Sequence, residues 1–259
     1  MTDWLATCRA AAADVRAVLA ERPDRADREP VLRRGEGGDD TTLIDHYAEE
    51  AVLRHFPDLA IVSEEVGISG TSPPVVVIDP IDGSLNAKRG IPFFSLSIAV
   101  ADGWTMDDVH FGYVYDFGTG EEWVARKGEG AFLNDRPLGP DLPKDEIELL
   151  AFEATLTSLV AERAGAMVGL AYRLRIMGSL ALSLCHLAAG RVDAVCSLKG
   201  ARSVDIAAGQ LLVRERGLAI ELFEDPPFGA APLDLESRSR LAAAGTAELC
   251  ARLAHALSA

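Results

Sequence analysis

Residues 77–84 read Val77-Ile78-Asp79-Pro80-Ile81-Asp82-Gly83-Ser84, and this stretch decides how the rest of the chain is interpreted. An apolar, β-branched run typical of a buried strand leads into two carboxylates placed three residues apart. Pro80 fixes the backbone φ directly after Asp79, and Gly83 permits a turn that a Cβ would hinder. We expect the N–H groups of Gly83 and Ser84 to face one concavity, an arrangement that suits a phosphate group.

A second acidic pair precedes this stretch. Glu64-Glu65 follows the apolar run 60–63, just as the first aspartate follows the run 75–79. Mg²⁺ prefers carboxylate and carbonyl oxygens, and two ions about 4 Å apart can clamp the attacking and leaving oxygens of a phosphoryl transfer. The residues therefore favour a metal-binding cluster at adjacent strand ends. The alternative is an ordinary exposed turn, because Asp-Pro-x-Asp-Gly is also a common turn sequence.

Elsewhere the apolar pattern predicts alternating helices and strands. The expected helices are 3–21, 41–56, 155–164, 179–189, 204–216 and one from 246, and the further strands are 93–101, 109–115, 121–125, 130–133, 147–152, 172–177, 191–196 and 218–223. The strands between 93 and 133 predict an antiparallel meander, and the strand–helix alternation after 147 indicates α/β layering. Residues 22–40 are expected to form a charged loop.

A boundary between two subdomains is expected at residues 138–145, which hold two prolines, a glycine and several charges. Residues 1–140 would form an N-terminal α+β subdomain with most of the metal ligands. Residues 141–259 would form a C-terminal α/β subdomain with Asp205 and the basic substrate-binding residues.

The composition excludes several classes of function. The chain has 259 residues, of which 49% are apolar and 25% charged, as is normal for a globular protein. Its net charge of −15 disfavours nucleic acid as a partner. No apolar run reaches the roughly 18 residues that span a bilayer, and the first residues do not read as a signal peptide. We therefore expect a cytoplasmic protein that binds neither membrane nor nucleic acid.

Three separated blocks carry a resemblance to the inositol monophosphatase superfamily of metal-dependent phosphatases. They are Ser63-Glu64-Glu65, then Asp79-Pro80-Ile81-Asp82-Gly83-Ser84-Leu85-Asn86, which is similar to the DPIDGTxN signature, and Val204-Asp205-Ile206-Ala207-Ala208-Gly209, which is similar to WDxAAG. Residues 90–99 and 173–179 further resemble the archaeal-type branch with fructose-1,6-bisphosphatase and inositol-1-monophosphatase activity. The resemblance implies an α/β fold, a layered α-β-α-β-α sandwich of the sugar phosphatase type, and a homodimer.

The resemblance also implies the chemistry, which is attack by metal-activated water on a small phosphate monoester. Two or three Mg²⁺ ions, or Mn²⁺ in their place, would serve as cofactors. The implied metal ligands are Glu64, Asp79, the carbonyl of Ile81, Asp82 and Asp205. The Ser84 hydroxyl, which stands where the family usually has Thr, would pair with Asp45 to orient and deprotonate the water, with Glu65 supporting the site.

Substrate binding is expected from the amides of Gly83 and Ser84 and from a group of polar and basic residues. Arg173 and Arg175 lie two apart on a predicted strand and so share one face. The other members of this group are Ser179, Lys199 and Arg202. Such basic residues favour a bisphosphate such as fructose 1,6-bisphosphate, because guanidinium groups bind phosphate through forked hydrogen bonds. The alternative is that they only balance surface acids.

Two other functions remain open. One is a 3′-phosphoadenosine phosphate phosphatase, although no aromatic platform for an adenine ring is evident in the sequence. The other is a non-catalytic protein that binds phosphosugars or metal, which the intact ligands at every matched position disfavour.

Overall fold

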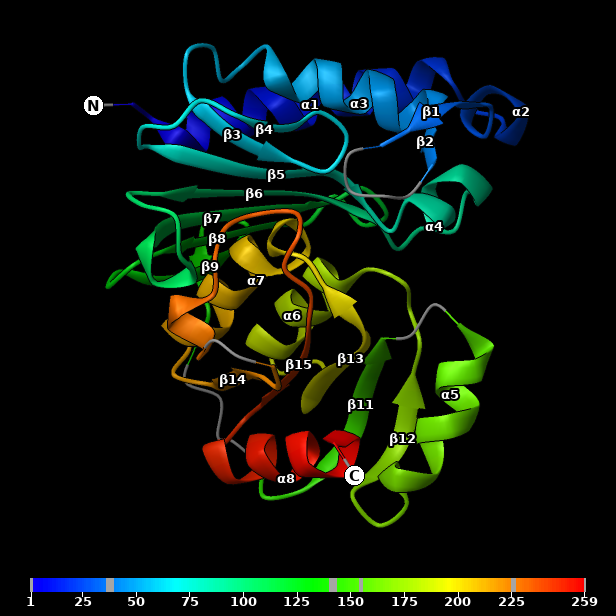
Figure 1. Cartoon of the computed structure of the whole chain (residues 1–259), viewed down its shortest axis with the longest axis vertical. Helices are drawn as coiled ribbons and strands as arrows, with labels where there is room; N and C mark the ends of the chain where they lie inside the picture. Colours follow the sequence, from blue (N-terminus) through cyan, green and yellow to red (C-terminus); the bar gives the residue numbers. More distant parts are fainter. Residues whose placement is uncertain (1, 36–39, 140–143, 154–155, 225–226, 259) are drawn as a thin grey trace.

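The structure is a computed structural model, and it describes residues 2–35, 40–139, 144–153, 156–224 and 227–258. Helices and sheets alternate from one end of the molecule to the other (Figure 1). A helix pair covers an eight-stranded sheet, a second helix pair separates it from a five-stranded sheet, and further helices cover the far face. The predicted layered α-β-α-β-α architecture is confirmed.

The first layer consists of α1 (Trp4–Glu21) and α3 (Leu43–Leu53). Apolar side chains at helical spacing form the buried face of α1, and Asp3 caps its first turn by accepting the N–H of Ala6 at 3.1 Å. These faces pack on the eight-stranded sheet in one apolar cluster. The expected loop at 22–40 was wrong in part, since it contains α2 (Arg25–Arg28), β1 (Val31–Arg34) and the start of β2 (Asp40–Thr42). All of β1 is exposed, so no buried face marked it in the sequence.

The eight-stranded sheet has the order β10-β9-β8-β7-β6-β5-β3-β4. Its strands are β3 (Ala60–Ser63), β4 (Gly67–Ser69), β5 (Val75–Asp82), β6 (Ser95–Ala101), β7 (Val109–Asp116), β8 (Glu122–Arg126), β9 (Gly130–Leu133) and β10 (Arg136–Pro137). From β5 to β10 the strands form the antiparallel meander that the sequence predicted. In contrast, β3 runs parallel to β5, so the carboxyl ends of these two strands meet at the same edge.

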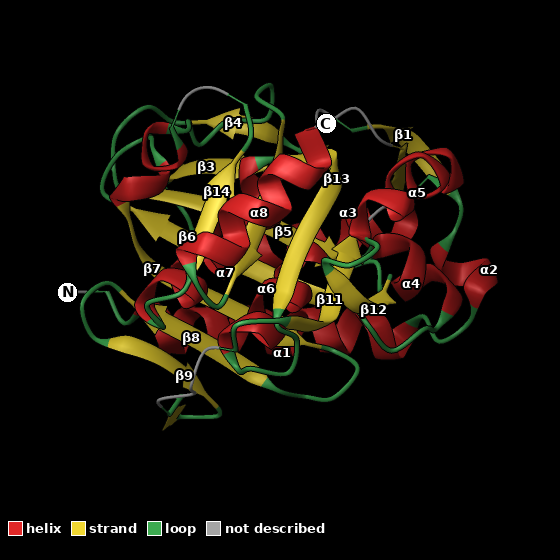
Figure 2. Cartoon of the chain, turned by 90° about the horizontal axis from the view of Figure 1, so that it is seen from below, coloured by secondary structure: helices red, strands yellow, loops and turns green. Residues whose placement is uncertain are grey.

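The five-stranded sheet has the order β12-β11-β13-β15-β14. Its strands are β11 (Ile147–Glu153), β12 (Ala171–Arg175), β13 (Ala194–Ala201), β14 (Ala219–Leu222) and β15 (Ser239–Ala244). Sequence analysis missed β15, whose alanines have little strand propensity. Between the two sheets lie α6 (Leu180–Ala188) and α7 (Ser203–Glu215), while α5 (Thr157–Arg163) and α8 (Ala247–Ser258) lie on the far side (Figure 2).

The predicted subdomain boundary falls between residues 140 and 141, which lie outside the described residues. The two sheets are drawn from either side of it, but α6 and α7 share one apolar core with strands of both sheets. The division into subdomains therefore stays a prediction. No described helix combines the length and the apolar character that crossing a bilayer requires.

Candidate active site

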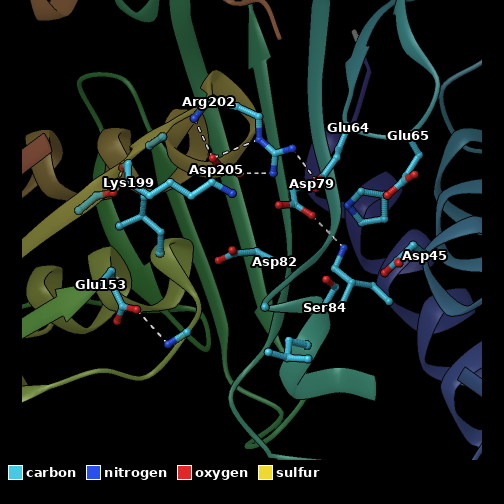
Figure 3. A pocket seen from close by; sticks show the side chains of 18 of the residues that line it. Asp45, Glu64, Glu65, Asp79, Asp82, Ser84, Glu153, Lys199, Arg202 and Asp205 are labelled. Carbon is cyan, nitrogen blue, oxygen red and sulfur yellow. Dashed lines mark hydrogen bonds and ion pairs between the residues drawn. The ribbon is translucent and has the colours of Figure 1, made fainter. Parts of the chain in front are cut away.

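A cavity of about 360 Å³ lies at the edge where β3 and β5 end, next to the start of α7 (Figure 3). The turn after β5 leads directly into α4 (Ser84–Arg89), a short helix that sequence analysis missed. The acidic residues that line the cavity are Asp40, Asp45, Glu64, Glu65, Asp79, Asp82, Glu153 and Asp205, and the basic ones are Lys88, Lys199, Arg202 and Arg238. The cavity thus gathers every predicted metal ligand, together with Gly83 and Ser84.

The two aspartates of the motif are held so that each keeps one oxygen without a partner among the described residues. Oδ1 of Asp79 accepts the N–H of Ile81 at 3.0 Å. Oδ2 of Asp82 accepts the Ser179 hydroxyl at 2.5 Å and the N–H of Ala181 at 2.7 Å. Because the bonded oxygen fixes each carboxylate, its other oxygen is available to a ligand in the cavity.

Glu64 and Asp205 are joined by Arg202, which was predicted to bind substrate. The guanidinium of Arg202 donates to Glu64 Oε1 at 2.5 Å and to Asp205 Oδ1 at 3.0 Å. Its backbone N–H donates to Asp205 Oδ2 at 2.7 Å, which caps the start of α7. Arg202 therefore contacts two predicted metal ligands from its place in the cavity wall.

Crowding of these buried acids changes their protonation. Burial is the largest cause that raises the pKa of Glu64 to about 7, and Asp205 adds to it while Arg202 opposes it. Burial likewise raises the pKa of Asp82 to about 7, and burial with the neighbouring Glu64 and Asp82 raises that of Asp79. A divalent cation would relieve this repulsion, and a donor set made of carboxylate and carbonyl oxygens fits Mg²⁺ or Mn²⁺.

Asp45 and Ser84 line the same cavity, but their described side chains do not hydrogen-bond to each other. Oδ2 of Asp45 instead accepts the N–H of Thr42 at 3.0 Å and its hydroxyl at 2.6 Å, and lies 3.2 Å from Nζ of Lys88. Sequence analysis missed Lys88. A lysine four residues beyond Ser84, in the first turn after the motif, was the signal available for it.

Glu65 is buried beside these residues. Its carboxylate accepts the hydroxyl of Thr41, and its carbonyl accepts a guanidinium N–H of Arg33 at 2.9 Å. Burial raises the pKa of Glu65. These contacts tie the strand end that carries Glu64 to the segment that carries Asp45.

The structure places only some of the predicted substrate-binding residues at the cavity. Lys199 lines the cavity, and Ser179 lies behind it, bonded to Asp82. Arg173 and Arg175 are exposed on β12 and are not part of the cavity wall. The guanidinium of Arg173 lies 4.4 Å from the centre of the Tyr172 ring. Sequence analysis missed Arg238, which lines the cavity from a loop that carries no motif.

A separate group with metal-ligand spacing lies elsewhere. Atoms of Asp116, Glu121 and His186 all lie within 4.8 Å of one another. However, the guanidinium of Arg191 donates to both oxygens of Glu121 at 2.6 Å, so this cluster already has a cation. Among the described residues, no three acids of the main cavity meet this distance.

The layered α-β-α-β-α fold places carboxylate and carbonyl oxygens around one cavity of about 360 Å³, an arrangement that fits a phosphatase. Residues 3–259 match the profile of the inositol monophosphatase family, and the chain belongs to that family.

Relatives of known name are similar over most of the chain. A fructose-1,6-bisphosphatase/inositol-1-monophosphatase of Methanothermobacter thermautotrophicus is 33% identical over 256 residues, which cover 89% of this chain and 91% of the relative. A Nus factor SuhB of Pasteurella multocida is 38% identical over 191 residues, which cover 69% of this chain and 70% of the relative. A solved inositol monophosphatase–fructose 1,6-bisphosphatase superposes with a TM-score of 0.86 at 27% identity, covering 98% of this chain and 100% of that one.

Proposed function

We propose that this protein hydrolyses a small phosphate monoester with Mg²⁺ as cofactor, and that fructose 1,6-bisphosphate and inositol 1-phosphate are its substrates. The observation that carries the proposal is the convergence of Glu64, Asp79, Asp82 and Asp205 on one cavity that also contains the Gly83-Ser84 turn. A relative that is 33% identical bears both activities in its name.

Two ions would share these ligands. Glu64, Asp79 and the Ile81 carbonyl would hold the first, and Asp79, Asp82 and Asp205 the second, with a third ion near Glu64. Bound Mg²⁺ supplies positive charge against the phosphoryl oxygens and lowers the pKa of a water molecule. The raised pKa values of Glu64 and Asp82 support this assignment, because such acids gain most from a nearby cation.

The chain itself would orient the reactants. Asp45, held by Thr42 and Lys88, would take the proton of the attacking water, with the Ser84 hydroxyl aligning that water. The amides of Gly83 and Ser84 would hold phosphate oxygens. In this hydrolysis the water oxygen forms a bond to phosphorus, the ester P–O bond breaks, and the alcohol leaves with a proton.

The basic part of the cavity wall favours a second phosphate on the substrate. Lys199 and Arg238 both line the cavity, and the Cβ of Arg238 lies 2.9 Å from the position that a Cβ on Gly200 would occupy. Because Gly200 has no Cβ, the segment that carries Lys199 can approach Arg238. A bisphosphate sugar would meet these cations with its distal phosphate.

The direct test is phosphate release from fructose 1,6-bisphosphate, inositol 1-phosphate and 3′-phosphoadenosine 5′-phosphate, each with Mg²⁺ and with a chelator. We expect release from the first two, only with Mg²⁺, and a loss of at least about a hundredfold in Asp82→Asn with the circular dichroism spectrum unchanged. Release only from the adenosine compound would support the nucleotide phosphatase instead. Absence of release above the chelator control would indicate a binding protein and refute the proposal.

We also propose that two copies associate through the free edge of β12. Large apolar side chains are exposed there and just beside it: Val168 is 85% exposed, Tyr172 76% and Ile176 50%. Among the described strands β12 is the outermost of its sheet, so one side of its backbone pairs with none of them. Light scattering should give the mass of a dimer for the native chain and of a monomer for Tyr172→Glu. A monomeric native chain would refute this proposal.

A further inference from the structure

Glu153, the last residue of β11, lies in the cavity wall without any role in the proposed reaction. It is buried, and its carboxylate has no ion-pair partner among the described residues. Instead it accepts three hydrogen bonds: from the Ser183 hydroxyl at 2.6 Å, from the N–H of Gly178 at 2.9 Å and from that of Met177 at 3.4 Å. Burying a carboxylate that only neutral donors hold is costly, and here the hydrogen bonds that offset this cost fix one segment of the chain in place.

The segment that Glu153 holds is the turn Met177–Ser179. On the other side of this turn, Nδ2 of Asn86 donates to the carbonyl of Met177 at 2.7 Å. Gly178 has a φ of +90°, and a Cβ there would lie 3.0 Å from Nδ2 of Asn86. The turn is therefore clamped between Glu153 and Asn86, in a conformation that favours glycine.

This turn and the start of α6 directly after it supply the two donors that orient Asp82. The Ser179 hydroxyl and the N–H of Ala181 both donate to Oδ2 of Asp82, at 2.5 and 2.7 Å. The Ser179 oxygen also accepts the N–H of Leu182 at 3.3 Å, which ties it to the start of α6. A shift of the turn would therefore rotate the carboxylate of Asp82 and turn its other oxygen away from the cavity.

We propose that Glu153 is a positioning residue for the metal site, acting through the turn Met177–Ser179 on the orientation of Asp82. The inference rests on the proposed function, because it gives Asp82 the role of a metal ligand. The chemistry requires a carboxylate: both oxygens of Glu153 accept N–H groups of the turn, one of them also accepting a hydroxyl. Glutamine has the same shape, but it must set an NH₂ group against one of these donors.

The test measures Mn²⁺ binding by titration calorimetry, without substrate, for the native chain, Glu153→Gln, Ser179→Ala and the double variant. Loss of a hydrogen-bonding partner behind a metal ligand lowers affinity by about 10- to 100-fold, and we expect a loss in this range for Glu153→Gln. Since both residues act on the same carboxylate, the double variant should bind within about threefold of the weaker single variant. The inference would be overturned if the losses of Mn²⁺ affinity in the two single variants multiplied in the double variant. An unchanged Mn²⁺ affinity in Glu153→Gln would overturn it too.

Glu122→Gln is the matched control. Glu122 is also buried and accepts hydrogen bonds from Arg9 and Tyr113, but it lies on β8 outside the cavity. This variant should lose thermal stability and keep the native Mn²⁺ affinity. If Glu122→Gln lost as much Mn²⁺ affinity as Glu153→Gln, the effect of Glu153→Gln would come from general destabilisation, and the inference would be overturned.

Substrate kinetics separate the remaining explanations. If Glu153 touched substrate directly, Glu153→Gln would raise KM and leave Mn²⁺ binding unchanged, which also overturns the inference. We expect kcat at subsaturating metal to fall and KM to change little. A native chain that neither binds Mn²⁺ nor releases phosphate would refute the proposed function, and this inference with it. If the native chain binds Mn²⁺ and releases phosphate, and Glu153→Gln does so to the same extent, only this inference is refuted.

Discussion

Gly83 offers a sharp test of how tightly the phosphate-binding turn is built. Its φ is +90°, and a Cβ at this position would lie 3.0 Å from the carbonyl oxygen of Gly178, 3.1 Å from that of Phe93 and 3.2 Å from Cβ of Phe94. Two of these three neighbours are backbone atoms, which cannot move aside by rotation of a side chain. Alanine would therefore add crowding to the cost of a left-handed backbone.

Gly90 is the matched control, because it shares the left-handed conformation with a φ of +71° but a Cβ there would meet nothing within 4 Å. The left-handed backbone costs a residue with a Cβ about 1–2 kcal/mol, partly offset by about 0.4–1 kcal/mol from the stiffer unfolded chain. Both of these contributions to the free energy of unfolding apply equally to Gly83→Ala and Gly90→Ala. Only Gly83→Ala carries the further cost of crowding, about 1–3 kcal/mol.

Calorimetric melting of the native chain and both variants provides the assay. At about 2–4 °C per kcal/mol for a chain of this size, Gly83→Ala should melt about 2–12 °C below Gly90→Ala. Gly83→Ala should also lose at least about tenfold in phosphate release, because the backbone that holds the phosphate must shift. Equal melting temperatures for the two variants, or full activity in Gly83→Ala, would refute the reasoning.

Three further predictions concern the charges around the cavity. In chelator, thermal stability should fall as pH rises from about 4 through 7, because the raised pKa values of Glu64 and Asp82 mean that their protonated forms stabilise the fold. Mg²⁺ should make thermal stability less dependent on pH. A melting temperature that rises over this pH range in chelator would contradict the prediction. Arg202→Gln should melt below the native chain in chelator and gain more from saturating Mg²⁺, because its guanidinium is a counter-charge of Glu64, and an equal gain in both proteins would count against that role. Thr42→Val should cost about 1 kcal/mol through the lost helix cap and should lower turnover by loosening Asp45, while Thr42→Ser should retain both; a fully active Thr42→Val would show that this bond does not matter to the reaction.

Local rules in the sequence predicted the acids at the strand ends, whereas Asp205 was assigned to the same site only through the family resemblance. An apolar run that ends in Asp-Pro-x-Asp-Gly must turn where the strand ends, and parallel pairing of β3 with β5 brings Glu64 to the same edge. The layer order followed from strand–helix alternation together with the family resemblance. These features depend on short stretches of chain, whose conformation is set by neighbouring residues.

Contacts between distant segments were not predictable in the same way. Glu153 reads as an ordinary acid at the end of a strand, and only the approach of the turn Met177–Ser179 gives it donors. Arg202 was assigned to substrate from its charge, yet charge does not reveal which carboxylates a guanidinium will reach. The exposed strand β1 carries no alternation of burial, so its residues were taken as a loop.

The helix pair α6–α7 limits how this enzyme can admit and release its reactants. Because both helices share one apolar core with strands of both sheets, the halves of the molecule cannot swing apart without exposing that core to water. Substrate and product must therefore enter and leave through the opening of the cavity. Motion at the site should come from side chains and loops at the rim of the cavity rather than from hinge opening. Cutting the chain between the two sheets should for the same reason give fragments that are insoluble on their own.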